Sequence, residues 1–129
     1  MHISIDSSDS TPIYEQLVSA LKALINRGEI KTGDELPSVR QLAQDLGVNL
    51  NTVARAYREL ARLGVLSVRQ GRGVSVVGVK GRADEAARAE LRKMAARLAN
   101  EALFRGIRPE DVHQMIDSAL KDLGEVGKP

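Results

Sequence analysis

The sequence predicts a mainly α-helical protein with one small β-hairpin. Apolar residues recur at helical spacing in five separate segments, and only residues 66–76 alternate apolar and polar residues as strands do. Glycine or proline separates most of these segments. At 129 residues the chain has room for one small domain with a short appendage, but not for a separate catalytic domain.

The composition indicates a soluble globular protein, with 43% hydrophobic and 28% charged residues. No apolar run approaches the roughly 20 residues that span a membrane, and the first residues do not resemble a signal peptide. We therefore expect a cytoplasmic protein with no membrane partner. The absence of cysteine excludes disulfides, thiolate nucleophiles and cysteine-bound metals.

Charge is unevenly distributed along the chain, although the net charge is only +2. Residues 1–35 carry 3 basic and 6 acidic side chains, residues 36–80 carry 7 and 2, and residues 81–129 carry 9 of each. A basic middle segment is typical of a surface that binds a polyanion, although mixed surface charge alone also produces such imbalances. Nucleic acid is therefore a candidate partner on charge alone.

The first helix is expected to begin at Pro12, after the capping hydroxyl of Thr11, and to end at Gly28. Its apolar face consists of Ile13, Leu17, Leu21, Leu24 and Ile25. This spacing predicts one amphipathic helix.

The next two helices are short and meet at a tight corner. Ser38 and Gln41 have the spacing of a capping box for the second helix, which Gly47 closes. Asn49 is the expected cap of a third helix that runs to about Leu63. The buried face of the second helix consists of Val39, Leu42, Ala43 and Leu46. Two helices joined in this way are typical of a helix-turn-helix.

The period changes after the third helix. Leu66 and Val68 alternate with polar neighbours, as do Val74 and Val76, and residues 70–73 supply a turn. A β-hairpin directly after the third helix of a helix-turn-helix is a wing.

The last third of the chain predicts two more helices. Residues 83–105 form the first, which Gly106 ends, and Pro109 begins another whose apolar face ends before Gly124. We expect the two to fold into a helical hairpin with one apolar side. A monomer would leave that side exposed. We therefore predict a homodimer formed through Leu91, Met94, Leu98, Val112, Met115, Ile116 and Leu120.

The third helix has two contrasting faces at about 100° per residue. The apolar face consists of Val53, Ala56, Tyr57, Leu60 and Leu63. The opposite face consists of Asn51, Arg55, Arg58 and Arg62. Such side chains can read bases and hold phosphates in a major groove, whereas the alternative is a solvated charged face. Arg69 and Arg72 in the following hairpin favour the DNA interpretation, although a glycine-rich hairpin turn alone is often only a turn.

Several short motifs together resemble the DNA-binding domain of the GntR family, over about residues 11–77. They are LPSVRQLA at 36–43, LGVN at 46–49, NTVARAYREL at 51–60, GVL at 64–66 and RQGRG at 69–73. The opening PIYEQL at 12–17 is similar to the YtrA-like and MocR-like branches. MocR-like members continue into a large aminotransferase-like domain, so this short chain is expected to be YtrA-like.

The resemblance implies roles for particular residues. Arg40, at the start of the second helix, is expected to contact DNA. Asn49, Asn51 and Thr52 are expected to do so at the start of the recognition helix, and Gly71 matches the glycine of the wing.

Two positions depart from the family pattern. Leu50 stands where many members have arginine or another polar or proline residue, and Ala54 stands where the fatty-acid-responsive branch has arginine. We therefore expect Arg55 and Arg58 to carry more of the DNA contacts.

Other functions find less support in the sequence. His113 and Asp117 are four residues apart on a predicted helix, but two ligands are too few for a metal site. Met94 and Met115 lie in apolar stripes and are better explained as packing residues. No set of residues supports catalysis. The remaining alternative to DNA binding is a winged-helix module whose third helix binds an acidic protein.

The sequence therefore predicts a winged helix-turn-helix domain over residues 1–80 and a two-helix C-terminal dimerisation tail over residues 81–129. We expect a homodimeric DNA-binding transcription regulator, a repressor that recognises a palindromic operator in double-stranded DNA. We predict neither a cofactor nor a metal, and the sequence identifies no small-molecule effector.

Overall fold

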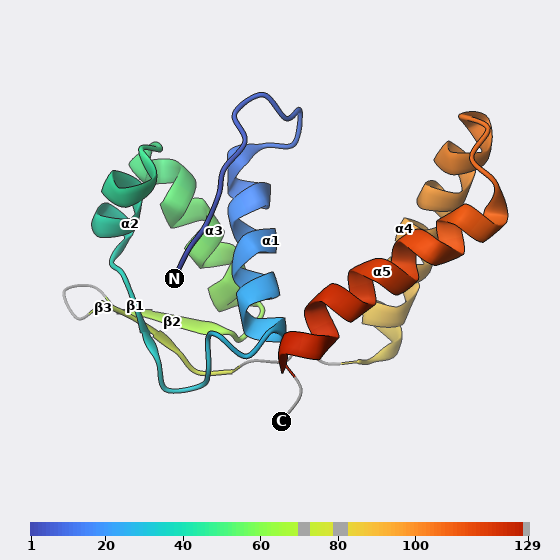
Figure 1. The fold of residues 1–129 in the computed structure, drawn as a ribbon. Coiled ribbons are helices and arrows are strands. Elements are labelled where there is room, and N and C mark those ends of the chain that lie inside the picture. Colours follow the sequence, from blue (N-terminus) through green and yellow to red (C-terminus); the bar gives the residue numbers. More distant parts are fainter. Residues whose placement is uncertain (70–72, 79–82, 128–129) are drawn as a thin grey trace. The chain divides into compact units, whose positions relative to one another are not determined.

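A computed structural model describes residues 1–69, 73–78 and 83–127 of the chain. The chain divides into two compact units, Met1–Gly81 and Arg82–Val126, which are described separately (Figure 1). No helix of the described residues is long and apolar enough to cross a membrane.

The first unit combines three helices with a small antiparallel sheet. The helices are α1 (Ile13–Asn26), α2 (Val39–Leu46) and α3 (Leu50–Arg62). The strands are β1 (Glu35–Leu36), β2 (Leu66–Arg69) and β3 (Gly73–Val76), in the order β1-β3-β2. The predicted helices and hairpin are confirmed.

The strand β1 does not follow from the sequence pattern. Glu35 pairs with Ser75 and Leu36 with Val74. A strand of two residues is too short to show the alternation that identifies strands in a sequence. It adds a third strand to the sheet on the far side of β3 from β2.

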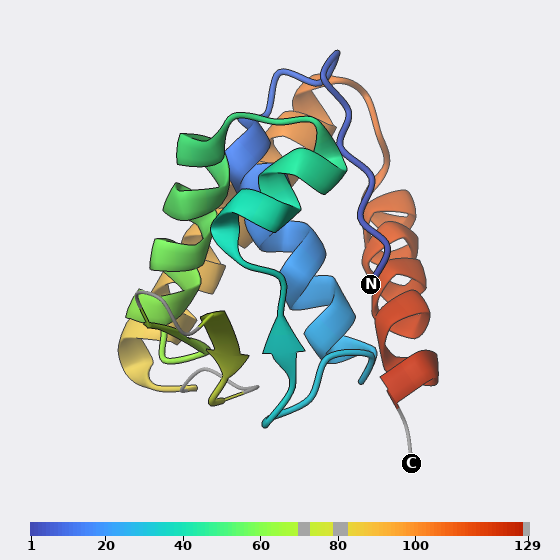
Figure 2. The same cartoon turned by 90° about the vertical axis from the view of Figure 1, so that its left-hand side faces the viewer.

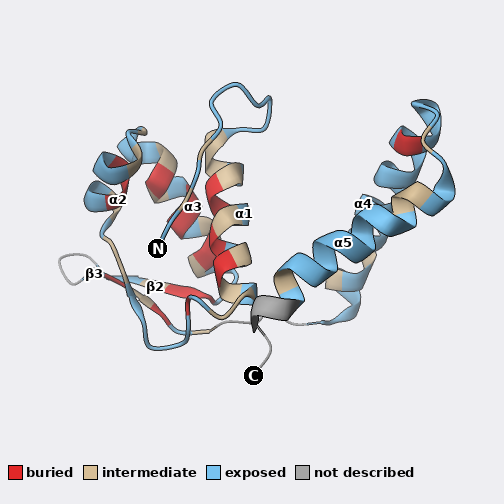
Figure 3. Ribbon diagram, viewed as in Figure 1, coloured by how far each residue is buried: buried red, intermediate tan, exposed pale blue. Residues whose placement is uncertain are grey.

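The core of this unit surrounds α3, which packs on α1, α2 and β2 (Figure 3). Val53, Ala56, Tyr57 and Leu60 are completely buried, as the helical spacing predicts. Leu63 was expected on the same face but is 39% exposed, because the helix ends there and Leu63 is its C-cap. The amphipathic pattern therefore holds along α3 and fails only at its end.

The start of α1 differs from the prediction. Pro12 is the N-cap rather than the first helical residue, and no side chain caps the helix. Instead, the Gln16 amide donates hydrogen bonds of 2.9 Å to the carbonyl oxygens of Asp6 and Thr11, and its oxygen accepts one from the Asp6 N–H. Gln16 thereby ties the N-terminal segment to α1.

The predicted capping box of α2 is half formed. The Ser38 hydroxyl accepts a hydrogen bond of 3.1 Å from the Gln41 N–H. The Gln41 side chain donates to the Asp45 carboxylate at 2.7 Å, one turn further along α2. The Gln41 side chain is therefore engaged with Asp45 and does not reach back to accept a hydrogen bond from the Ser38 N–H, as a full capping box requires.

The second unit contains α4 (Glu85–Phe104) and α5 (Pro109–Gly127). Asp84 caps α4 by accepting a hydrogen bond from the Ala87 N–H at 2.9 Å. The helix α5 continues through Gly124, where the sequence predicted an end, because a single glycine weakens a helix without stopping it.

The two helices of this unit were expected to fold against each other. Instead they diverge from the turn at Gly106 and do not pack together along their described residues (Figure 2). Each helix therefore lacks a partner for its apolar face within the unit.

Candidate nucleic-acid interface

The corner between α2 and α3 determines how α3 is presented. Gly47 has a φ of +67°, a left-handed conformation that favours glycine, and it ends α2. Asn49 then caps α3, because its side-chain oxygen accepts a hydrogen bond of 2.8 Å from the Asn51 N–H. The oxygen of Asn49 is thus used by the fold, and its NH₂ group is the part that can donate to DNA.

The outer face of α3 is polar and accessible. Asn51, Arg55 and Arg58 are exposed, and Thr52 is half-buried at the first turn. Arg40, in the first turn of α2, is also exposed. The structure therefore gives these side chains the accessibility that DNA binding requires, while their contacts with DNA stay predictions.

Ion pairing divides the arginines of this unit into two groups. Arg62 donates to both carboxylate oxygens of Glu59, at 2.6 and 3.2 Å. These hydrogen bonds lower the pKa of the Glu59 carboxyl and raise the pKa of Arg62. Within the described residues, ion pairs do not involve the predicted DNA contacts Arg40, Arg55, Arg58 and Arg69. Their guanidinium groups can pair with phosphates without first breaking a salt bridge.

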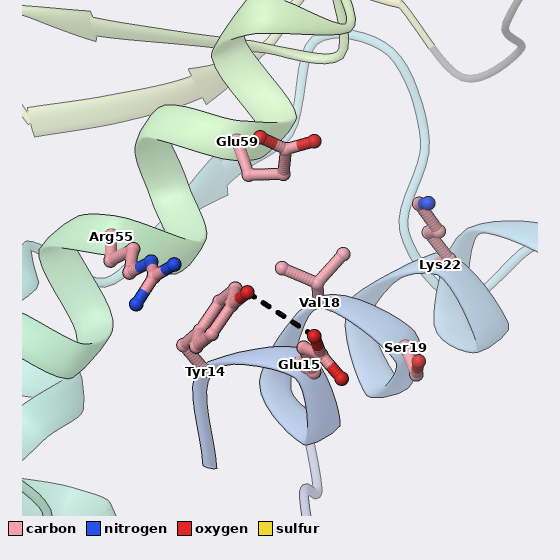
Figure 4. Close-up of a pocket in the computed structure, with 7 residues that line it drawn as sticks. All are labelled: Tyr14, Glu15, Val18, Ser19, Lys22, Arg55 and Glu59. Atoms are coloured by element: carbon pink, nitrogen blue, oxygen red, sulfur yellow. Dashed lines mark hydrogen bonds between the residues drawn. The ribbon is translucent and has the colours of Figure 1, made fainter. Parts of the chain in front are cut away.

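Arg55 makes a contact that the sequence did not predict. Its guanidinium lies over the ring of Tyr14 on α1, 3.7 Å from the ring centroid. Figure 4 shows the two side chains facing each other across a cleft between α1 and α3, with Glu15, Lys22 and Glu59 also lining it. This stacking orders a long side chain at the edge of the outer face of α3.

The wing carries the remaining predicted contacts. Arg69 is exposed at the end of β2, opposite Gly73 of β3. Gly73 has a φ of +86°, so β3 begins with a glycine in a left-handed conformation. Gly71 and Arg72 lie outside the described residues, and their roles stay predictions.

The predicted dimerisation residues of the tail are accessible in the single chain. Val112 is half-buried, and the other six are 40–62% exposed: Leu91, Met94, Leu98, Met115, Ile116 and Leu120. His113 and Asp117 both lie on α5. No group of three or more potential metal ligands gathers within the described part of the chain.

A helix-turn-helix with a following β-hairpin, an accessible Asn/Arg face and arginines that form no ion pair with the described residues defines a winged helix-turn-helix DNA-binding protein. Residues 13–76 match the family described as bacterial regulatory proteins, gntR family. The chain belongs to this GntR family. It is 37% identical over 122 residues to the HTH-type transcriptional repressor YtrA of Bacillus subtilis (strain 168), covering 94% of each chain.

Solved structures agree with this assignment. A transcriptional antiterminator from Listeria monocytogenes EGD-e superimposes with a TM-score of 0.87 and 28% identity, covering 96% of this chain and 93% of that one. YtrA from Sulfolobus acidocaldarius, a GntR-family transcription factor, is 40% identical with a TM-score of 0.61, covering 76% and 97%.

A third structure contains DNA. The DNA-binding domain of AraR in complex with operator ORX1 gives a TM-score of 0.52 at 28% identity, covering 60% of this chain and 99% of that one. The present chain is thus a YtrA-like, DNA-binding transcription regulator of the GntR family, not an enzyme.

Proposed function

We propose that the protein represses transcription as a homodimer that occupies a palindromic operator. The similarity to a curated YtrA repressor over almost the whole chain supports repression. Occupation of promoter DNA needs only a specific DNA-binding surface, and the outer face of α3 with the wing supplies one. Binding energy comes largely from arginine contacts to phosphates, and specificity comes from the first turns of α3.

The observation that supports a homodimer is that the apolar faces of α4 and α5 in the second unit are both exposed. The helices α4 and α5 do not pack together, and their large apolar side chains remain exposed. A soluble protein seldom leaves so many apolar side chains together in water. The two diverging helices of a second copy can cover them, with each face meeting its symmetry mate.

A two-fold dimer has a direct consequence for DNA. It presents two copies of α3, related by the same two-fold axis, to one duplex. The preferred operator is therefore palindromic, with half-sites about one helical turn apart.

Two measurements with the purified chain test this function. Sedimentation at micromolar concentration should show a species of twice the 14.0 kDa chain mass. Selection from a random duplex pool should return a palindrome, and binding to random duplexes should weaken steeply with salt. A monomer that selects no preferred duplex, or binding that ignores salt, contradicts the proposal and favours a protein-interaction module.

A further inference from the structure

A shallow groove lies on the first unit between the start of α2, the first turn of α3 and the wing. Its apolar lining is Val39, Leu50, Val68 and Val74. Two arginines, Arg40 and Arg69, also line it, from α2 and β2 respectively. No acidic side chain lines the groove within the described residues.

Two of the apolar side chains are left open to solvent. Leu50, the first residue of α3, is 44% exposed, and Val68 is 45% exposed. By strand alternation Val68 shares the sheet face of Leu66, which is only 4% exposed. The hairpin therefore extends past the core, and its last apolar position on that face lies at the groove instead.

The chemistry of the groove identifies its occupant. Arg40 and Arg69 both lack ion pairs within the described residues, so their guanidinium groups can bind phosphates. Leu50 and Val68, which line the same groove, can contact an apolar group of the ligand. The first turn of a recognition helix is the part that enters the major groove. The apolar group that a duplex displays there is the C5-methyl of thymine.

We propose that Leu50, supported by Val68, contacts the C5-methyl group of one thymine in each operator half-site and thereby selects thymine at that position. This inference rests on the proposed function, because it requires a specific operator. Arg40 and Arg69 hold flanking phosphates and fix the register. Leu50 therefore reads the base sequence through an apolar contact rather than through a hydrogen bond. From its departure from the family pattern alone, we expected Leu50 to contribute less to DNA binding than Arg55 and Arg58.

The test removes single methyl groups from the selected duplex. Each thymine is replaced in turn by deoxyuridine, and dissociation constants are measured by fluorescence anisotropy for the full chain. At one symmetric position the loss of the methyl should weaken wild type by about three- to fivefold, the value of one buried methyl group. Leu50→Ala should bind the thymine and uracil duplexes equally.

Two further variants sharpen the result. Leu63→Ala, at the opposite end of α3 and 39% exposed, is the matched control and should keep the full methyl effect. Val68→Ala should reduce the effect without removing it. Both Leu50 and Val68 are exposed, so circular dichroism should show unchanged folding.

Three outcomes would overturn the inference, and they are distinguishable. An equal methyl effect in Leu50→Ala and wild type shows that another residue reads the thymine. A specific, salt-sensitive operator with no methyl-sensitive thymine excludes this contact while leaving the proposed function intact. Failure to select any preferred duplex removes the proposed function and the methyl contact together.

Discussion

The hydroxyl of Tyr57 donates a hydrogen bond of 2.7 Å to the carbonyl oxygen of Pro37. Tyr57 lies in the middle of α3 and is completely buried, and Pro37 immediately precedes the N-cap of α2. This contact joins the recognition helix to the start of its partner helix, twenty residues earlier in the chain. Burial raises the pKa of Tyr57, because the phenolate would lose its hydration.

Tyr57→Phe should therefore lower the free energy of unfolding by about 1–2 kcal/mol at neutral pH, because the Pro37 carbonyl loses its partner. Urea denaturation measures this difference. Tyr14→Phe is the matched control, since its hydroxyl makes an exposed hydrogen bond to Glu15 and its loss should cost almost nothing. Equal effects of the two substitutions would show that the bond to Pro37 is unimportant.

The raised pKa of Tyr57 also predicts a pH dependence. Its value in the unfolded chain is near 10.0, so above that pH the unfolded state ionises first and is stabilised relative to the fold. Below that pH the contribution of Tyr57 to the free energy of unfolding is fully present, and it is lost as the pH rises above that value. The stability difference between wild type and Tyr57→Phe should thus narrow as the pH rises from about 10 to about 12. A constant difference across this range would contradict the assigned pKa direction.

The stacking of Arg55 on Tyr14 predicts a graded loss of DNA binding. Arg55→Ala should weaken operator binding by about 1–3 kcal/mol, as should Asn51→Ala on the same face. Tyr14→Leu should weaken it by about 0.5–1 kcal/mol, because Arg55 loses its orientation, whereas Tyr14→Phe keeps the ring and the affinity. Anisotropy titrations measure all four variants. If Tyr14→Leu has the same cost in an Arg55→Ala background, the two residues are not coupled.

The sequence predicted the parts of the interface that depend on helix period alone. Both faces of α3 follow from a fixed rotation per residue, and they appear in the structure as expected except at Leu63, where the helix ends. The contact between Tyr14 and Arg55 does not follow, because it depends on how α1 crosses α3, and spacing along one helix carries no such information. The groove containing Leu50 and Val68 likewise exists only once the wing is placed beside α3.

The second unit shows what the period of a helix cannot predict. Its helices and their apolar stripes were predictable, but the divergence of α4 from α5 was not. An apolar stripe indicates that a helix packs against something. It does not distinguish a neighbour in the same chain from one in a second copy.

The wing arginine Arg69 should act through phosphate rather than base contacts. Arg69→Ala should weaken binding to operator and to random duplexes about equally, and it should reduce the salt slope by about one unit. Arg97→Ala, which removes an exposed cation of α4, is the control and should leave both quantities unchanged. A loss confined to the operator would mean that Arg69 contacts a base.

The exposed stripe of α4 predicts a substitution that separates dimerisation from folding. Leu98→Asp places a carboxylate on the face shared with Leu91 and Met94, where a dimer would bury it without a partner. We expect a monomer that keeps a folded first unit, since α4 belongs to the other unit. Ala96→Asp, on the opposite side of the same helix, adds the same charge at an exposed position and should remain dimeric.

Sedimentation at micromolar concentration distinguishes these states, and an operator titration then reports their consequence. The Leu98→Asp monomer should bind a single half-site weakly, because it loses the gain that comes from linking two recognition helices. If Leu98→Asp stays dimeric with full operator affinity, the stripe is not the interface. If Ala96→Asp dissociates equally, added charge anywhere on α4 destabilises the dimer, and the apolar face has no special role.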